Sequence, residues 1–91
     1  MIKMEFTDDI WRDYGFVVSG KNRVKVIKAI GDKTLMPTQI AEESGILLNH
    51  ISNLLRLLKY KELVECINPE YRKGRLYRLT EKGKMIYEKL D

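Results

Sequence analysis

Residues 37–61, PTQIAEESGILLNHISNLLRLLKYK, constrain the fold of this chain more than any other stretch. Pro37 suits the first turn of a helix and Gly45 suits a left-handed turn, so the spacing predicts a short helix, a tight turn and a longer helix over 47–61. At about 100° per residue the longer helix has an apolar stripe and a polar arc. The stripe is Ile51, Leu55 and Leu58, and the arc is Asn49, Ser52, Asn53, Arg56, Lys59 and Tyr60. Two helices joined in this way indicate a helix-turn-helix, whose second helix can enter a DNA major groove.

The length and the charge of the chain narrow the classes of partner. Ninety-one residues suffice for one hydrophobic core, so we expect residues 1–91 to form a single domain. The formal net charge is +4; residues 1–13 carry −2, and residues 14–91 therefore carry +6. This excess favours a polyanionic partner, because lysine and arginine that neutralise phosphates release condensed counterions. The alternative is a set of cations that are simply solvated.

The sequence lacks the residues and motifs that several classes of protein require. With one cysteine, Cys66, and one histidine, His50, the chain can form neither an internal disulfide nor a tetrahedral zinc site. No apolar run reaches the length of a signal peptide or a membrane span, so we expect a soluble, cytoplasmic protein. We find no catalytic set and no glycine-rich phosphate loop, and therefore expect neither an enzyme, nor a cofactor, nor a metal.

The N-terminal third predicts two further helices. Residues 7–18 have helical spacing of apolar residues, with Thr7 as the N-cap and a buried stripe of Ile10, Tyr14, Val17 and Val18. A second helix is predicted from Ser19, as its N-cap, to Gly31. Trp11 and Phe16 lie off the first helix's stripe, so they either cover the domain's own core or meet a second subunit. After Gly31, Leu35 and Met36 suggest a short strand.

The C-terminal third predicts a hairpin and a last helix. Residues 63–67 and 75–79 read as strands, and the segment between them, NPEYRKG, contains turn signals. Thr80 opens a helix over 80–91, whose buried side is Met85, Ile86 and Leu90. The hairpin tip is cationic, with no acid between Tyr71 and Arg78, which favours phosphates or a narrow minor groove. A solvated charge run is the alternative reading.

The order of these elements resembles the winged helix-turn-helix regulators of the MarR and ArsR type, in particular small archaeal members. The resemblance covers roughly residues 19–90. It rests on Ile40, Ala41, Gly45, Ile51, Ser52, Leu55, Leu58, Leu63, Val64, Tyr77, Leu79, Thr80 and Gly83. It implies an α+β, mainly α fold: a winged helix-turn-helix with a β-hairpin wing at 63–79 and terminal helices at 1–18 and 80–91.

The resemblance also implies a function, a DNA-binding transcriptional regulator. The 47–61 helix would lie in the major groove of double-stranded DNA, and the wing, at 69–78, on the backbone or in the minor groove. The chain would act as a homodimer, with helix 1–18 as a candidate dimerisation element. The residues expected to contact DNA are Thr38, Gln39, Asn49, His50, Ser52, Asn53, Arg56, Arg72, Lys73 and Arg75.

Three leucines depart from the pattern and keep a second interpretation open. Leu47 stands where a serine or asparagine N-cap is common, and Leu54 and Leu57 replace residues that are usually polar. They indicate either a wider core or a surface that meets another chain. The alternative function is a winged-helix protein-interaction module in a transcription or replication assembly. Cys66 is expected to be a small buried hydrophobe, and His50 to contact phosphate or a helix end.

Overall fold

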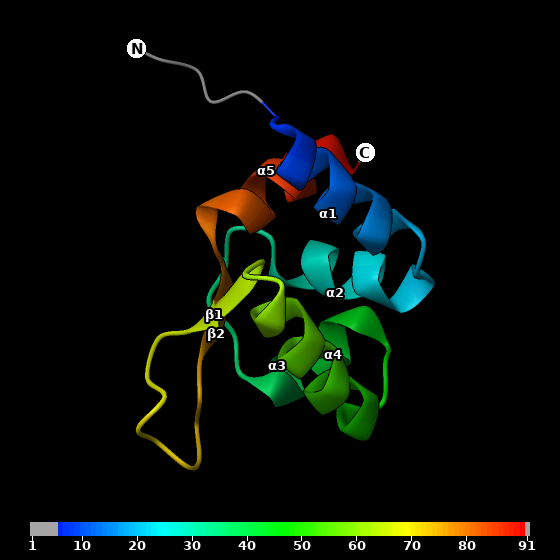
Figure 1. Cartoon of the computed structure of the whole chain (residues 1–91). Coiled ribbons are helices and arrows are strands. Elements are labelled where there is room, and N and C mark those ends of the chain that lie inside the picture. Colours follow the sequence, from blue (N-terminus) through cyan, green and yellow to red (C-terminus); the bar gives the residue numbers. More distant parts are fainter. Residues whose placement is uncertain (1–5, 91) are drawn as a thin grey trace.

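The computed structural model describes residues 6–90 (Figure 1). Within this part of the chain there are five helices and a two-stranded hairpin at one side of the helices, which confirms the expected α+β, mainly α class with a β-hairpin wing (Figure 1). In chain order the elements are α1 (Asp8–Val18), α2 (Lys21–Ile30), α3 (Pro37–Ser44), α4 (Leu48–Tyr60), β1 (Val64–Cys66), β2 (Tyr77–Leu79) and α5 (Glu81–Lys89).

Most of the predicted helix ends are confirmed by their capping geometry. The Thr7 hydroxyl accepts a hydrogen bond from the Ile10 backbone N–H at 3.3 Å, and the Thr80 hydroxyl accepts one from Gly83 at 3.1 Å. Each bond satisfies an N–H that the first turn of a helix leaves without a backbone partner. Pro37 begins α3, and Gly45 ends it in the left-handed conformation, with φ of 76°.

The predicted role of Ser19 as an N-cap is wrong. Ser19 is the C-cap of α1, with φ of −77° and ψ of −7°, and Gly20 is the residue that precedes α2. Its backbone N–H donates to the Gly15 carbonyl, and its hydroxyl donates to the Phe16 carbonyl at 2.8 Å. The residue is therefore held in the last turn of α1 and cannot adopt the extended backbone that an N-cap requires.

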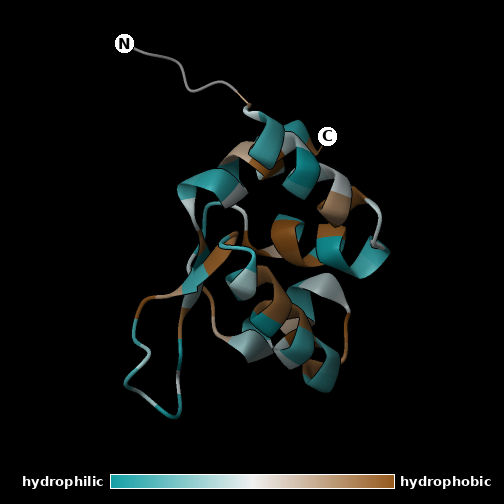
Figure 2. Cartoon of the chain, viewed as in Figure 1, coloured by the Kyte–Doolittle hydropathy of each residue, from teal (hydrophilic) through white to brown (hydrophobic). Residues whose placement is uncertain are grey.

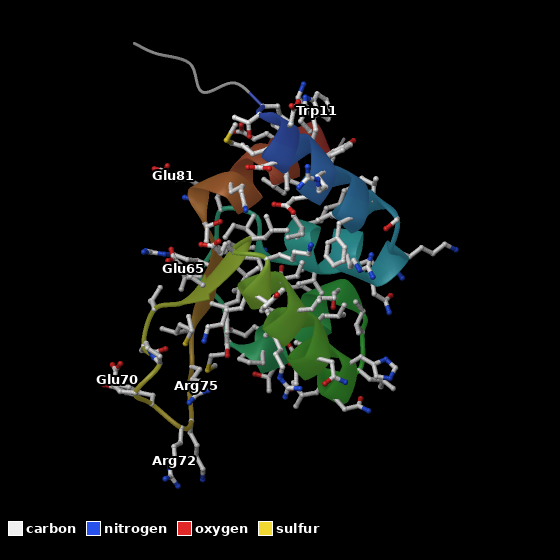
Figure 3. All side chains as sticks on the ribbon, in the orientation of Figure 1. Trp11, Glu65, Glu70, Arg72, Arg75 and Glu81 are labelled. Carbon is white, nitrogen blue, oxygen red and sulfur yellow. The ribbon has the colours of Figure 1, made fainter. Side chains whose placement is uncertain are left out.

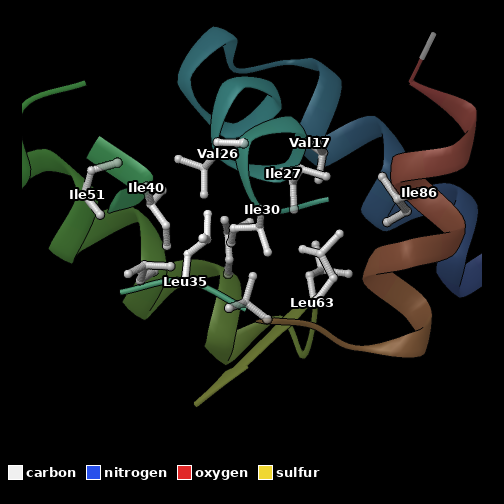
Figure 4. Packing of buried hydrophobic residues seen from close by; sticks show 14 of the residues in the cluster. Val17, Val26, Ile27, Ile30, Leu35, Ile40, Ile51, Leu63 and Ile86 are labelled. Carbon is white, nitrogen blue, oxygen red and sulfur yellow. The ribbon is translucent and has the colours of Figure 1, made fainter. Parts of the chain in front are cut away.

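Helix α2 lies at the centre of the molecule, with α1 and α5 on one side and α3 and α4 on the other (Figure 1). It contacts each of these helices and β2. Figure 4 shows its apolar side chains meeting those of the surrounding elements, and Figure 2 shows that the wing loop is mainly hydrophilic. The buried residues of α2 are Val26, Ile27, Ala29 and Ile30. Burying a side chain of this size stabilises the fold by about 1.5–3 kcal/mol, so α2 anchors both halves.

The predicted burial of apolar residues in the two terminal helices needs correction at three positions. Val18 is exposed, because Ile10 and Val17 already occupy the core-facing side of α1 and Val18 follows one residue later on the helix. In α5, Ile86 is fully buried, whereas Met85 and Leu90 are half-buried and pack against the core's edge.

The hairpin is shorter than the sequence predicts. Strands β1 and β2 pair antiparallel, with Val64 opposite Leu79, Glu65 opposite Arg78 and Cys66 opposite Tyr77. Beyond this ladder the two arms share the bond from the Ile67 N–H to the Leu76 carbonyl. The strand suggested at Leu35 and Met36 is reduced to a single bridge, in which Leu35 exchanges both backbone hydrogen bonds with Tyr77. This bridge fixes the start of α3 against the base of the wing.

Candidate nucleic-acid interface

The two faces predicted for the long helix are confirmed by burial. Ile51, Leu55 and Leu58 are buried, whereas all six residues of the polar arc are exposed. Helix α4 contains Arg56 and Lys59 and no carboxylate. One side of α4 is thus fixed in the core, and the other presents amides, a hydroxyl and cations to solvent.

A groove of about 280 Å³ separates α4 from the base of the wing. It is lined by Pro37, Ser52, Leu55, Arg56, Lys59, Arg75 and Tyr77. Three cations from two elements, Arg56, Lys59 and Arg75, therefore border one concave surface. The sequence placed Lys59 on the polar arc without proposing it as a contact. Its position seven residues after Ser52, on the same side of the helix, is the signal that identifies it.

The wing loop has an internal hydrogen-bond network centred on Asn68. The Asn68 side-chain amide donates to the Gly74 carbonyl at 3.1 Å, and its oxygen accepts from the Leu76 N–H at 2.8 Å. Gly74 has φ of 71°, a conformation that favours glycine. The sequence indicated Asn68 only as part of a turn signal, so its role in joining the two arms of the wing was missed.

The cationic side chains of the wing differ in the groups that they contact. Arg75 donates from Nε to the Tyr71 carbonyl and from Nη2 to the Pro69 carbonyl at 3.2 Å, so it braces the loop from inside. Arg78 pairs with Glu65, the residue opposite it in the ladder, at 2.9 Å. Figure 3 places Arg72 at the far end of the wing, with Arg75 closer to its base. Arg72 and Lys73 are both exposed at the tip.

The remaining predicted contact residues are exposed at the starts of α3 and α4. Thr38 and Gln39 are exposed in the first turn of α3, and His50 is exposed in the first turn of α4. The Gln39 side-chain oxygen accepts from the Met36 backbone N–H at 2.8 Å, so it caps α3. The amide nitrogen of Gln39 remains able to donate to a partner.

Phe16 and Trp11 have different environments, although both lie off the predicted stripe. Phe16 is half-buried between two cations: the Arg23 guanidinium carbon is 4.0 Å from the ring centroid and Lys61 Nζ is 4.9 Å from it. Such cation–π contacts hold Phe16 within the domain. Trp11 is 49% exposed and packs edge-on against Tyr14, with 5.7 Å between ring centroids. Of the two, Trp11 offers the open aromatic surface.

The described residues contain neither a group of side chains that could hold a metal ion nor a helix that could span a membrane. Between residues 6 and 90, no three side chains of His, Cys, Asp and Glu are grouped so as to hold a metal ion. The helices in this part of the chain are too short or too polar to cross a membrane.

Cys66 is half-buried rather than fully buried, and its thiol lies 3.6 Å from the Asn68 side-chain oxygen.

Several solved structures have a similar fold, including two of NadR and one of SPO1453. NadR in complex with 4-hydroxyphenylacetate matches with a TM-score of 0.69 at 17% identity, over 99% of this chain and 76% of that chain. Ligand-free NadR matches with a TM-score of 0.68 at 17% identity, over 89% of this chain and 61% of that one. The MarR family transcriptional regulator SPO1453 from Silicibacter pomeroyi DSS-3 matches with a TM-score of 0.70 at 16% identity, over 91% and 62%.

The comparison is informative at the level of fold. No family model matches the sequence, and no curated protein matches it either. The chain spans less than two thirds of the length of ligand-free NadR and of SPO1453. At these identities a shared fold does not transfer a function. The expected architecture is nevertheless confirmed: this chain has the MarR-type winged helix-turn-helix fold.

Proposed function

We propose that this protein is a DNA-binding transcriptional regulator. In this proposal α4 lies in the major groove of double-stranded DNA, and the wing follows the backbone or the adjacent minor groove. The observation that carries the proposal is the shared groove, where Arg56 and Lys59 of α4 and Arg75 of the wing border one surface. Cations on two sides of a groove can each neutralise a phosphate, which favours a polyanion.

The polar arc supplies groups that can read base edges. Asn49 and Asn53 have side-chain amides that can pair bidentately with adenine, and Arg56 can reach guanine or a phosphate. Ser52 is short enough for a base or phosphate contact; its hydroxyl lies 3.4 Å from the Leu48 carbonyl. Thr38, Gln39 and His50 flank this arc and are assigned to backbone contacts, which set the register of the protein on the duplex.

We further propose that the protein acts as a homodimer in the cytoplasm. The terminal helices α1 and α5 lie on the side of α2 remote from α3 and α4, so a second subunit could pair there while both DNA-reading helices stay free (Figure 1). The half-exposed side chain of Trp11 on α1 supports the assignment of this surface to subunit pairing. A two-fold dimer implies palindromic half-sites about 34 Å apart, one helical turn of DNA.

A titration of labelled genomic duplexes at several salt concentrations tests the proposal. We expect affinity to fall steeply with salt, with a slope of about 0.9 for each phosphate contacted. Asn53→Ala should relax the base preference and leave the slope unchanged. Asn22→Ala is the matched control, because Asn22 is an exposed amide on α2, outside the proposed DNA and dimer surfaces. Binding that is weak, independent of salt and equal in all variants would contradict the proposal.

The second candidate is a protein-interaction module of a transcription or replication assembly. It is favoured by the aromatic cluster at the N-terminus, where the Trp11 ring centroid lies 4.8 Å from that of Phe6. This function predicts little salt-dependent duplex binding and a stable complex with a partner protein. The same titration therefore distinguishes the two candidates.

A further inference from the structure

Two adjacent leucines at the start of α4 are exposed. Leu47 is 68% exposed and Leu48 is 46% exposed. Leu47 is the N-cap of α4, and its side chain makes no capping hydrogen bond. A Ser, Thr, Asn or Asp there would satisfy an N–H and stabilise the helix. Burial in the core therefore does not fully account for either side chain, and capping of α4 does not account for Leu47.

The leucines adjoin the polar arc and the groove. At about 100° per residue, Leu48 falls on the same side of α4 as Ser52 and Lys59, which both line the groove beside the wing. Asn49 follows directly on the exposed arc. Leu48 thus extends the groove-lining side of α4 to the N-terminal end of the helix, and Leu47 is the exposed residue that directly precedes it.

The charges of α4 and the wing as a whole favour one kind of partner for the surface that includes the leucines. Helix α4 has two cations and no acid, and the wing tip adds Arg72 and Lys73. The partner must therefore be strongly anionic and still offer small apolar points. Double-stranded DNA has both features in its major groove, where the C5-methyl group of thymine projects between the phosphate backbones.

We propose that Leu48, assisted by Leu47, reads thymine methyl groups beside the adenines that the asparagines are placed to pair with. This inference rests on the proposed DNA-binding function and adds a base preference to it. Contact with an apolar side chain is the usual means by which a protein recognises the thymine methyl. The preferred duplex should then contain at least one thymine at the position facing the N-terminus of α4.

Replacing thymine with deoxyuridine provides the test, because it removes the methyl group and leaves the hydrogen-bonding edges of the base pair unchanged. The probe is the tightest-binding genomic duplex, substituted one thymine at a time. At a thymine that meets Leu48, the dissociation constant of the wild-type protein should rise about four-fold, the value of one buried methyl-sized group. Leu48→Ala should bind the thymine and deoxyuridine duplexes equally. Lys25→Ala, which trims an exposed residue of α2 outside the proposed DNA and dimer surfaces, should keep the wild-type discrimination.

The outcomes separate this inference from the proposed function. Salt-dependent duplex binding with no thymine whose methyl matters would overturn the leucine assignment and leave the regulator proposal standing. Duplex binding that Leu48→Ala leaves unchanged in both affinity and discrimination would overturn it as well. The absence of salt-dependent binding to any duplex would refute both proposals together.

Discussion

Lys82 of α5 pairs with Asp13 of α1, with 2.9 Å between Nζ and Oδ2. Asp13 is only 8% exposed and is the one charged residue found in the buried set of the described chain. It occupies the core-facing side of α1, between Ile10 and Val17. The pair therefore joins the two terminal helices at a point where a carboxylate without a partner would be poorly solvated.

Lys82→Met should lower the free energy of unfolding. The substitution keeps an unbranched side chain of similar length but leaves the Asp13 carboxylate without its partner, which we expect to cost about 1–3 kcal/mol. Urea unfolding followed by circular dichroism measures the change. The exposed pair of Arg12 and Asp9, at 3.7 Å, is the control, since Arg12→Met should have little effect. Equal stabilities of the two variants would show that burial adds nothing to the Lys82 pair.

Gly83→Ala should be one of the most destabilising single substitutions in the chain. A Cβ at Gly83 would overlap the Leu63 carbonyl oxygen, which belongs to the backbone and also accepts a hydrogen bond from the Thr80 N–H. Helix α5 would have to move away from β1, so we expect a loss of about 3 kcal/mol or more. The melting temperature measured by calorimetry should fall accordingly.

Gly15→Ala is the matched control for this substitution. Gly15 lies within α1 and is exposed, and a Cβ there meets no atom within 4 Å. Alanine should raise stability by about 0.5–1 kcal/mol, because glycine loses more conformational freedom in a helix. A gain at Gly15 together with a large loss at Gly83 would assign the loss to the overlap. Similar changes at both positions would contradict this explanation.

Glu62→Gly should stabilise the protein. Helix α4 ends with the Leu63 N–H donating to the Leu58 carbonyl at 2.9 Å and the Glu62 N–H donating to the Lys59 carbonyl at 3.0 Å. This pair of bonds places Glu62 in the left-handed region, with φ of 61°, at the position where glycine is preferred. Glycine should add about 0.5–1 kcal/mol to the free energy of unfolding. Glu62→Ala keeps the Cβ and should give no such gain in the same urea titration.

Much of the fold could be predicted because its local signals agree with its packing. Pro37, Gly45 and Thr80 mark the helix ends where the structure has them, and the apolar stripe of α4 is the side that is buried. The prediction that Ser19 is an N-cap was wrong because a serine between two helices can end the first as well as begin the second. The hydrogen bonds that decide between these roles, from Ser19 to the carbonyls of Gly15 and Phe16, lie within α1 and are not specified by the residue type.

The features that the sequence did not predict depend on bonds that residue spacing does not reveal. The pairing of Asp13 with Lys82 joins two distant segments. The bracing of the wing by Arg75 and the left-handed Glu62 are local, but they depend on the path that the backbone takes through one loop and one helix end. Within the candidate interface, the exposed arc of α4 followed from periodicity alone. The groove that joins this arc to the wing did not, because it arises from the bridge between Leu35 and Tyr77 at the base of the wing.

Lysine substitutions at two wing arginines should distinguish charge from geometry. Arg75→Lys keeps the positive charge but cannot reproduce the two hydrogen bonds to Pro69 and Tyr71, because lysine lacks the planar fork of donors. We expect faster amide hydrogen exchange in the wing loop and a loss of duplex affinity of about 1 kcal/mol, or about five-fold. Arg72→Lys keeps the charge at the exposed tip and should change neither.

The slope of affinity against salt should be the same for both lysine variants, because each retains the cation that neutralises a phosphate. Hydrogen exchange does not depend on the DNA-binding proposal, so it tests the bracing role of Arg75 by itself. Wild-type exchange in Arg75→Lys would show that the two carbonyl contacts do not order the loop. Faster exchange with unchanged affinity would show instead that the wing is braced by Arg75 but that its order does not contribute to DNA binding.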